Sequence, residues 1–116
     1  MYLSITKIHL KNPGQIFLFF RHVRGISKQL QQSKCKRHRL KGGFMKHYTM
    51  TLWYSKEDLH EFVRSGAHGN SMKDINKVAR SFTTLTIDAY NLIPWREAMA
   101  MLEKEEKRRS AANKGK

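Results

Sequence analysis

A run of alternating residues near the middle of the chain sets the first limit on its fold. In KHYTMTLWY, residues 46–54, large apolar side chains occupy one face of an extended strand, and Thr49 and Thr51 lie on the other. YLSITKIHL at 2–10 and SFTTLTIDAY at 81–90 have the same β-branched, partly alternating character. We therefore expect a sheet whose two faces differ chemically.

Helical periodicity separates these strands. Asn12 suits an N-cap and Pro13 the first helical position, and apolar residues recur at helical spacing after them. Ser55 is expected to cap a second helix. Pro94 is expected to start a third helix, whose apolar positions end at Leu102.

The stretch SKCKRHRLKGGFM, residues 33–45, is too polar for a central strand and is expected to form an edge strand followed by a bend. The resulting order is β-α-β-β-α-β-α. This is the split βαβ, or ferredoxin-like, α+β pattern: a four-stranded antiparallel sheet with an additional C-terminal helix. We expect one domain over residues 1–102 and a charged, frayed or disordered tail over 103–116.

The two faces of this sheet are expected to have different neighbours. The first two helices would cover one face, and the hydroxyl-rich face would remain uncovered. The residues predicted on that face are Tyr2, Ser4, Thr6, Thr49, Thr51, Trp53, Thr84 and Thr86. The same face of a second copy would cover it with two-fold symmetry and leave a ligand pocket between the sheets. The alternative is a polar face open to water.

Charge is distributed unevenly along the chain. The sequence has 23 Lys and Arg against 9 Asp and Glu, a formal net charge of +14, and residues 1–56 contain no carboxylate. This excess favours an anionic partner such as nonspecifically bound nucleic acid, or it serves only solubility. The residues expected to bind anions are Lys34, Lys36, Arg37, Arg39 and Lys41.

Composition also bears on the location of the chain. No apolar run is long enough to span a membrane, and the N-terminus lacks a signal-peptide pattern. We therefore expect a cytoplasmic protein without a membrane partner. The single cysteine, Cys35, has no internal disulfide partner, and its cationic neighbours are expected to lower its thiol pKa.

The segment YTMTLWYSKEDLHEFVRSGAHGNSM, residues 48–72, resembles the dimeric α/β-barrel superfamily. That superfamily includes antibiotic biosynthesis monooxygenase-like proteins and small proteins related to spheroidene monooxygenase. The matching residues are Tyr48, Thr49, Thr51, Trp53, Ser55, Glu57, Phe62, Ser65, His68 and Met72. The resemblance implies a ferredoxin-like protomer that pairs as a homodimer into a barrel.

The resemblance also implies a function: a small organic molecule would bind, or be oxidised without a cofactor, in a cavity between sheet and helices. His68 would be the catalytic base or orienting group. The implied substrate contacts are Trp53, Thr51, Thr49, Phe62 and Met72. Haem-degrading members carry a tryptophan and a haem-ligating histidine ten residues apart, where this chain has Phe62 and Met72. No cofactor is therefore expected, although haem binding is not excluded by this mismatch.

Each of these residues has a structural alternative. His68 would otherwise cap a helix end, and Trp53 would pack at a dimer interface. No metal site is expected, because the spacing of metal ligands is not matched by His38, His47, His60 and His68. Three classes of function stay open: a monooxygenase-like enzyme, a basic module that binds anions or nucleic acid, and a barrel without catalysis.

Overall fold

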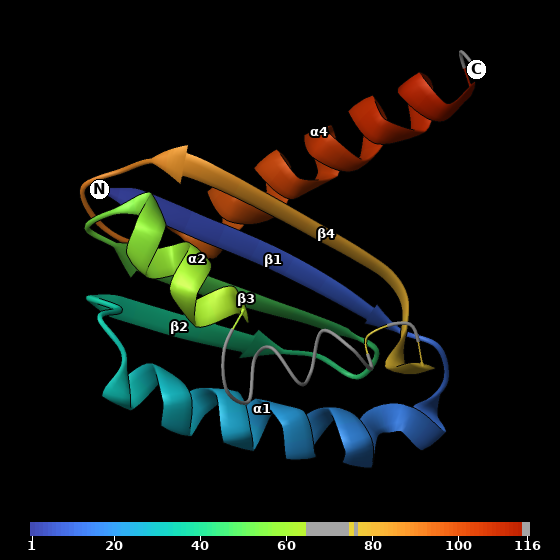
Figure 1. The fold of residues 1–116 in the computed structure, drawn as a ribbon. Helices are drawn as coiled ribbons and strands as arrows, with labels where there is room; N and C mark the ends of the chain where they lie inside the picture. The colour runs from blue at the N-terminus through green and yellow to red at the C-terminus, as the bar shows by residue number, and fades with distance from the viewer. Residues whose placement is uncertain (65–74, 76, 115–116) are drawn as a thin grey trace.

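The computed structural model describes residues 1–64, 75 and 77–114, which form an antiparallel sheet with helices on both faces (Figure 1). The strands are β1 (Tyr2–Leu10), β2 (Arg37–Gly42), β3 (Lys46–Trp53) and β4 (Ala79–Asp88). The helices are the 3₁₀ turn η1 (Pro13–Gln15), α1 (Ile16–Gln32), α2 (Lys56–Arg64) and α4 (Trp95–Lys114). The strand order β2-β3-β1-β4 is that of the split βαβ pattern, so the predicted fold class is confirmed.

Local signals set the helix starts, with one exception. Ser55 caps α2 as predicted, since its Oγ accepts a hydrogen bond from the backbone N–H of Asp58 at 3.2 Å. The expected side-chain cap at Asn12 is wrong, because that side chain makes no capping bond. The backbone of Asn12 instead accepts from the N–H of Gln15 at 3.1 Å and closes the turn η1. Pro13 occupies the first position of that turn.

The strand register collects hydroxyl groups on one face of the sheet. Ser4 lies opposite Thr51, while Thr6 lies opposite both Thr49 on β3 and Thr84 on β4. This threonine face lies beneath α1 and α2. The prediction that it remains uncovered and pairs with a second copy is therefore wrong. Small hydroxyl side chains can be covered because the facing helices supply the large apolar groups.

The opposite face of the sheet forms the largest apolar core and is covered by α4. Six of its residues are completely buried: Leu3, Ile5, Met50 and Leu52 from the strands, and Ala98 and Leu102 from the helix. Burial of four large strand side chains contributes roughly 1.5–3 kcal/mol for each side chain. The sheet therefore has a dry face against α4 and a hydroxyl-bearing face against α1 and α2.

Helix α4 continues beyond Leu102 to Lys114, so most of the segment expected to be a frayed tail is helical in this structure. Glu106 attaches the second half of the helix to the sheet. Its carboxylate lies 2.9 Å from Nζ of Lys7 and accepts a hydrogen bond of 3.2 Å from the hydroxyl of Thr83. Among the described residues, no helix has the length and apolar character that crossing a membrane requires.

Charge pairs within α4 also favour the helix over a frayed tail. Arg108 and Arg109, three and four residues after Glu105, donate hydrogen bonds of 2.6 and 3.0 Å to its carboxylate. These bonds, the one from Arg108 above all, lower the pKa of the Glu105 carboxyl to about 2. The charges that make the segment resemble a solvated tail therefore pair along a helix.

Candidate ligand pocket between the sheet and helices α1 and α2

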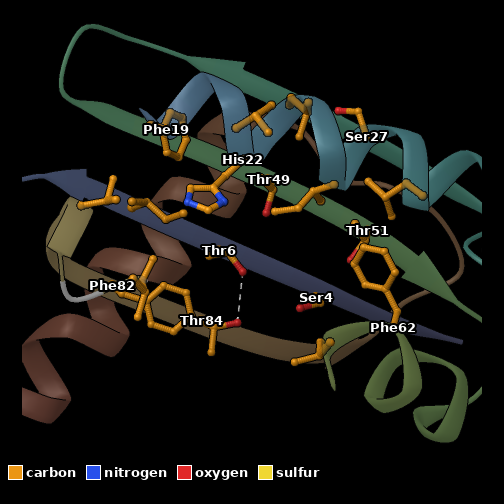
Figure 2. A pocket seen from close by; sticks show the side chains of 18 of the residues that line it. Ser4, Thr6, Phe19, His22, Ser27, Thr49, Thr51, Phe62, Phe82 and Thr84 are labelled. Atoms are coloured by element: carbon orange, nitrogen blue, oxygen red, sulfur yellow. Dashed lines mark hydrogen bonds between the residues drawn. The ribbon is translucent and has the colours of Figure 1, made fainter. Parts of the chain in front are cut away.

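A cavity of about 140 Å³ lies between the threonine face of the sheet and helices α1 and α2 (Figure 2). Among the described residues, six hydroxyl side chains line it: Ser4, Thr6, Ser27, Thr49, Thr51 and Thr84. Aliphatic and phenyl groups form most of the remaining wall, including Phe19, Ile26 and Phe62. Cavities of about 150 Å³ in protein cores take up benzene, so this cavity has room for a small ring.

The cavity carries no fixed charge on the lining residues that the structure describes, since Asp, Glu, Lys and Arg are absent from them. Transfer of an ion into such a site would remove its hydration without supplying a counter-charge. Apolar walls with a few hydroxyl groups are instead typical of sites for neutral organic ligands. The described geometry therefore suits an uncharged molecule that carries one or two oxygen atoms.

His22 is the titratable side chain of the described lining, and the sequence-based interpretation did not identify it. Figure 2 shows its imidazole extending from α1 toward β1, beside Phe19 and above Thr6. Histidine is the side chain most often used for proton transfer near neutral pH. The signal in the sequence is a polar residue within the apolar stripe of a helix, three positions after Phe19 and four before Ile26.

Two hydrogen bonds orient hydroxyl groups of the wall. Thr6 and Thr84 are joined through their Oγ1 atoms at 3.2 Å, as Figure 2 shows. Thr51 Oγ1 accepts a hydrogen bond of 2.9 Å from Nε1 of Trp53. An indole N–H only donates, so the Thr51 hydroxyl keeps its own proton for another acceptor.

The predicted substrate contacts are brought together only in part. Thr49, Thr51 and Phe62 line the cavity. Trp53 does not: it is completely buried behind the wall, with its ring centroid 5.2 Å from that of Phe62. The predicted residues His68 and Met72 lie outside the described residues.

His47 is a second buried histidine close to the cavity but outside its lining. Its ring lies 4.3 Å from that of Phe19 and 5.8 Å from that of Phe20, measured between centroids. Burial lowers the pKa of His47, and a hydrogen bond to the backbone of Phe44 opposes part of that effect. Its Nε2 has no hydrogen-bond partner in the described part of the chain.

The described structure contains no second reactive site at Cys35 and no cluster of potential metal ligands. Burial raises the pKa of the Cys35 thiol, so the expected lowering by neighbouring cations is wrong. Those cations point into solvent, where water screens their effect on the thiol. No group of three or more potential metal ligands occurs within residues 1–64, 75 and 77–114.

The predicted anion-binding residues do not form one site. Arg37, Arg39 and Lys41 alternate along the edge strand β2 and project away from the threonine face, all of them exposed. Lys34 instead forms an ion pair of 3.6 Å with α2. Lys36 lies over an exposed tyrosine ring, with Nζ 4.9 Å from the centroid. Anion binding by these residues stays a prediction.

Together, the fold and the cavity define a class: a ferredoxin-like α+β protein with an uncharged pocket between its sheet and two helices. No protein-family profile matches the sequence, and no curated protein matches it. Solved structures do match. An antibiotic biosynthesis monooxygenase superposes with a TM-score of 0.67 at 16% identity, over 78% of this chain and 100% of the other.

Two further structures match over similar lengths. Rv0793 from Mycobacterium tuberculosis has a TM-score of 0.65 at 11% identity, covering 81% of this chain and 100% of its own. A mutant of SnoaB, a cofactor-independent oxygenase from Streptomyces nogalater, has a TM-score of 0.59 at 10% identity, covering 80% and 96%. The chain therefore has the antibiotic biosynthesis monooxygenase-like fold, as the resemblance at residues 48–72 predicts.

Proposed function

We propose that the chain binds a small neutral organic molecule in the sheet–helix cavity and oxidises it with molecular oxygen, without a cofactor. The observation that carries this proposal is the cavity itself, which is uncharged over its described lining and combines His22 with six hydroxyl groups. The fold adds support, because SnoaB, which shares it, is a cofactor-independent oxygenase.

The described residues supply the parts that such a reaction needs. His22 would take a proton from an activated CH₂ group of the ligand, and the Thr51 hydroxyl would donate a hydrogen bond to a ligand oxygen. The resulting carbanion reduces oxygen. One oxygen atom becomes a carbonyl on the ligand carbon and the other leaves as water, so that CH₂ and O₂ yield C=O and H₂O. All four electrons come from the ligand.

His68 stays a second proposed base, on the strength of the resemblance at residues 48–72. The proposals for His22 and His68 rest on different support. His22 belongs to the described cavity wall, whereas His68 is proposed from the sequence resemblance alone. Separate His22→Ala and His68→Ala variants distinguish them. Arg21→Ala is the matched control on α1, since Arg21 is the adjacent residue and is exposed to solvent.

The test uses 2-indanone, a neutral molecule with an activated CH₂ group, and benzoate as a charged control. Thermal unfolding measures binding, and an oxygen electrode measures turnover. We expect 2-indanone to stabilise the protein, benzoate to have little effect, and His22→Ala to abolish oxygen uptake while Arg21→Ala retains it. Full oxygen uptake in His22→Ala would reject its role as base, and stabilisation without uptake would reduce the function to binding.

A homodimer is also part of the proposal, supported by the resemblance at residues 48–72. Its interface is not the threonine face, because α1 and α2 cover that face. The centre of the opposite face is covered by α4. Native mass spectrometry measures the assembly directly: a dimer supports this part of the proposal, and a monomer at micromolar concentration rejects it.

A further inference from the structure

We propose that one end of the molecule, formed by the start of α1 and the β2–β3 turn, docks on an anionic lipid bilayer. Three phenyl rings define this aromatic end: Phe17 and Phe20 on α1, and Phe44 in the turn. Their exposed fractions are 86%, 53% and 68%. Large exposed apolar groups gathered at one place mark interaction sites far more often than single ones do.

Both elements lie at the same end of the sheet (Figure 1). Strand β1 ends at Leu10 and leads directly into η1 and α1, and its residue Ile8 pairs with His47 beside the β2–β3 turn. His47 joins the two elements. Its ring meets that of Phe20 edge-on, and it bonds to the backbone of Phe44. His47 therefore places Phe20 beside the turn that carries Phe44, and Phe17 precedes Phe20 by three positions at the same end of α1.

The charged residues on the two elements that carry these rings are all cationic. Arg21, Arg24 and Lys28 are exposed on the outer side of α1, and Lys41 and Lys46 are exposed on either side of the turn. Residues 1–56, which include both of these elements, contain no carboxylate. Peripheral proteins bind anionic membranes through apolar side chains surrounded by cationic ones. The rings insert into the membrane interface, and the cations bind the lipid headgroups.

Two other occupants fit the described surface less well. A second copy would bring the same positive end against this one, and like charges repel. Nucleic acid bound by stacking needs a flat platform of rings, which the sheet of this fold provides when one face is open. Here α1 and α2 cover one face and α4 covers the other. Rings on a helix end and a turn tip project outward, as insertion into a fluid interface requires.

This inference does not depend on the proposed oxidation. Phe19 and His22 line the cavity from the inner side of α1, whereas the aromatic end uses the outer side and the turn. It does revise the sequence-based expectation that the chain has no membrane partner. That expectation concerns spanning segments, and three phenyl groups separated by up to 27 positions come to one end of the sheet only through the fold.

The experiment is sedimentation of the full chain with vesicles of phosphatidylcholine alone and of phosphatidylcholine mixed with phosphatidylglycerol. We expect binding to the anionic vesicles only. Replacing Phe17 and Phe44 together by serine should weaken binding by about tenfold or more. The matched control is Tyr90→Ser. Tyr90 is 90% exposed but follows β4, whose last residue Asp88 pairs with Tyr2 at the opposite end of the sheet.

A second pair of variants tests the charge. Arg21→Gln with Arg24→Gln should weaken binding about fivefold for each cation removed, whereas Arg96→Gln with Lys104→Gln on α4 should change it less. Circular dichroism confirms that each variant is folded. Three outcomes overturn the proposal: no binding to anionic vesicles, equal binding by the serine variant, or ring-dependent binding to a single-stranded oligonucleotide without binding to vesicles.

Discussion

The indole nitrogen of Trp53 donates a hydrogen bond of 2.9 Å to the hydroxyl oxygen of Thr51. Trp53 is completely buried, whereas Thr51 lines the cavity. A buried residue outside the cavity lining therefore orients a polar group of that lining. Because the bond uses a lone pair of Thr51, the hydroxyl proton is free to serve a ligand oxygen. Under the proposed function, Trp53 would be a positioning residue.

A double-mutant cycle tests the Trp53–Thr51 pair. Thr51→Val leaves the buried indole N–H without its acceptor, which should lower the free energy of unfolding by about 1–3 kcal/mol. The double variant Thr51→Val with Trp53→Phe should lose less free energy of unfolding than the sum of the two single losses, by about 1 kcal/mol. Urea denaturation measures each value. The control cycle combines Thr49→Val with Trp53→Phe. If the effects of Thr51→Val and Trp53→Phe on the free energy of unfolding simply added, the coupling between Thr51 and Trp53 would be contradicted.

Filling the cavity should separate stability from binding. Ser27 lies on the cavity wall, so Ser27→Leu places apolar atoms in the empty space and should raise the free energy of unfolding by about 1 kcal/mol. The same change should abolish stabilisation by neutral ring compounds. Lys28→Leu, at the adjacent exposed position, should leave that stabilisation intact. Equal ligand response in wild type and Ser27→Leu would show that the ligand binds elsewhere.

The buried His47 predicts a pH dependence of stability. Burial lowers its pKa from 6.5, so between the folded and unfolded values the unfolded state binds more protons. The free energy of unfolding should therefore fall as the pH drops below about 6.5, and level off below the folded pKa. His47→Leu should flatten this part of the curve, whereas His60→Leu, at an exposed position on α2, should not. Identical curves for wild type and His47→Leu would refute the assignment.

The contacts of Glu106 predict the behaviour of α4. Glu106→Ala removes the ion pair with Lys7 and the hydrogen bond from Thr83 and should lower the free energy of unfolding by about 1 kcal/mol. Glu103→Ala removes only an exposed pair within the helix and should change it by less than about 0.5 kcal/mol. Hydrogen exchange should show faster opening of the last turns of α4 in the first variant. Equal exchange in both variants would contradict this attachment.

Alternation and capping are local properties, so the sequence predicts the strands, the Ser55 cap and the order of elements correctly. The covered face is a tertiary property. Alternation places Leu52 and Thr51 on opposite faces of the sheet but does not predict which helix covers each face. In the structure, helices cover both faces. The helix beyond Leu102 also depends on a nonlocal contact, since Glu106 bonds to Lys7, which lies 99 residues earlier in the sequence.

The candidate site was predicted in part for the same reason. Thr49, Thr51 and Phe62 lie within the segment that carries the resemblance, and all three line the cavity. His22 lies outside that segment, within an apolar helix stripe that resembles an ordinary core contact. Only the packing of α1 over small threonine side chains leaves the space that makes His22 a wall residue.

Binding of a neutral ligand between the threonine face and α1 is tested most directly by methyl-resolved NMR during a titration with phenol. We expect shifts of the methyl groups of Ile8, Val23 and Ile26, which line the cavity, and little change at Leu3 and Ile5 beneath α4 or at Leu102 of α4 itself. Shifts confined to the α4 side, or no shift at the cavity methyl groups at saturating phenol, would contradict it.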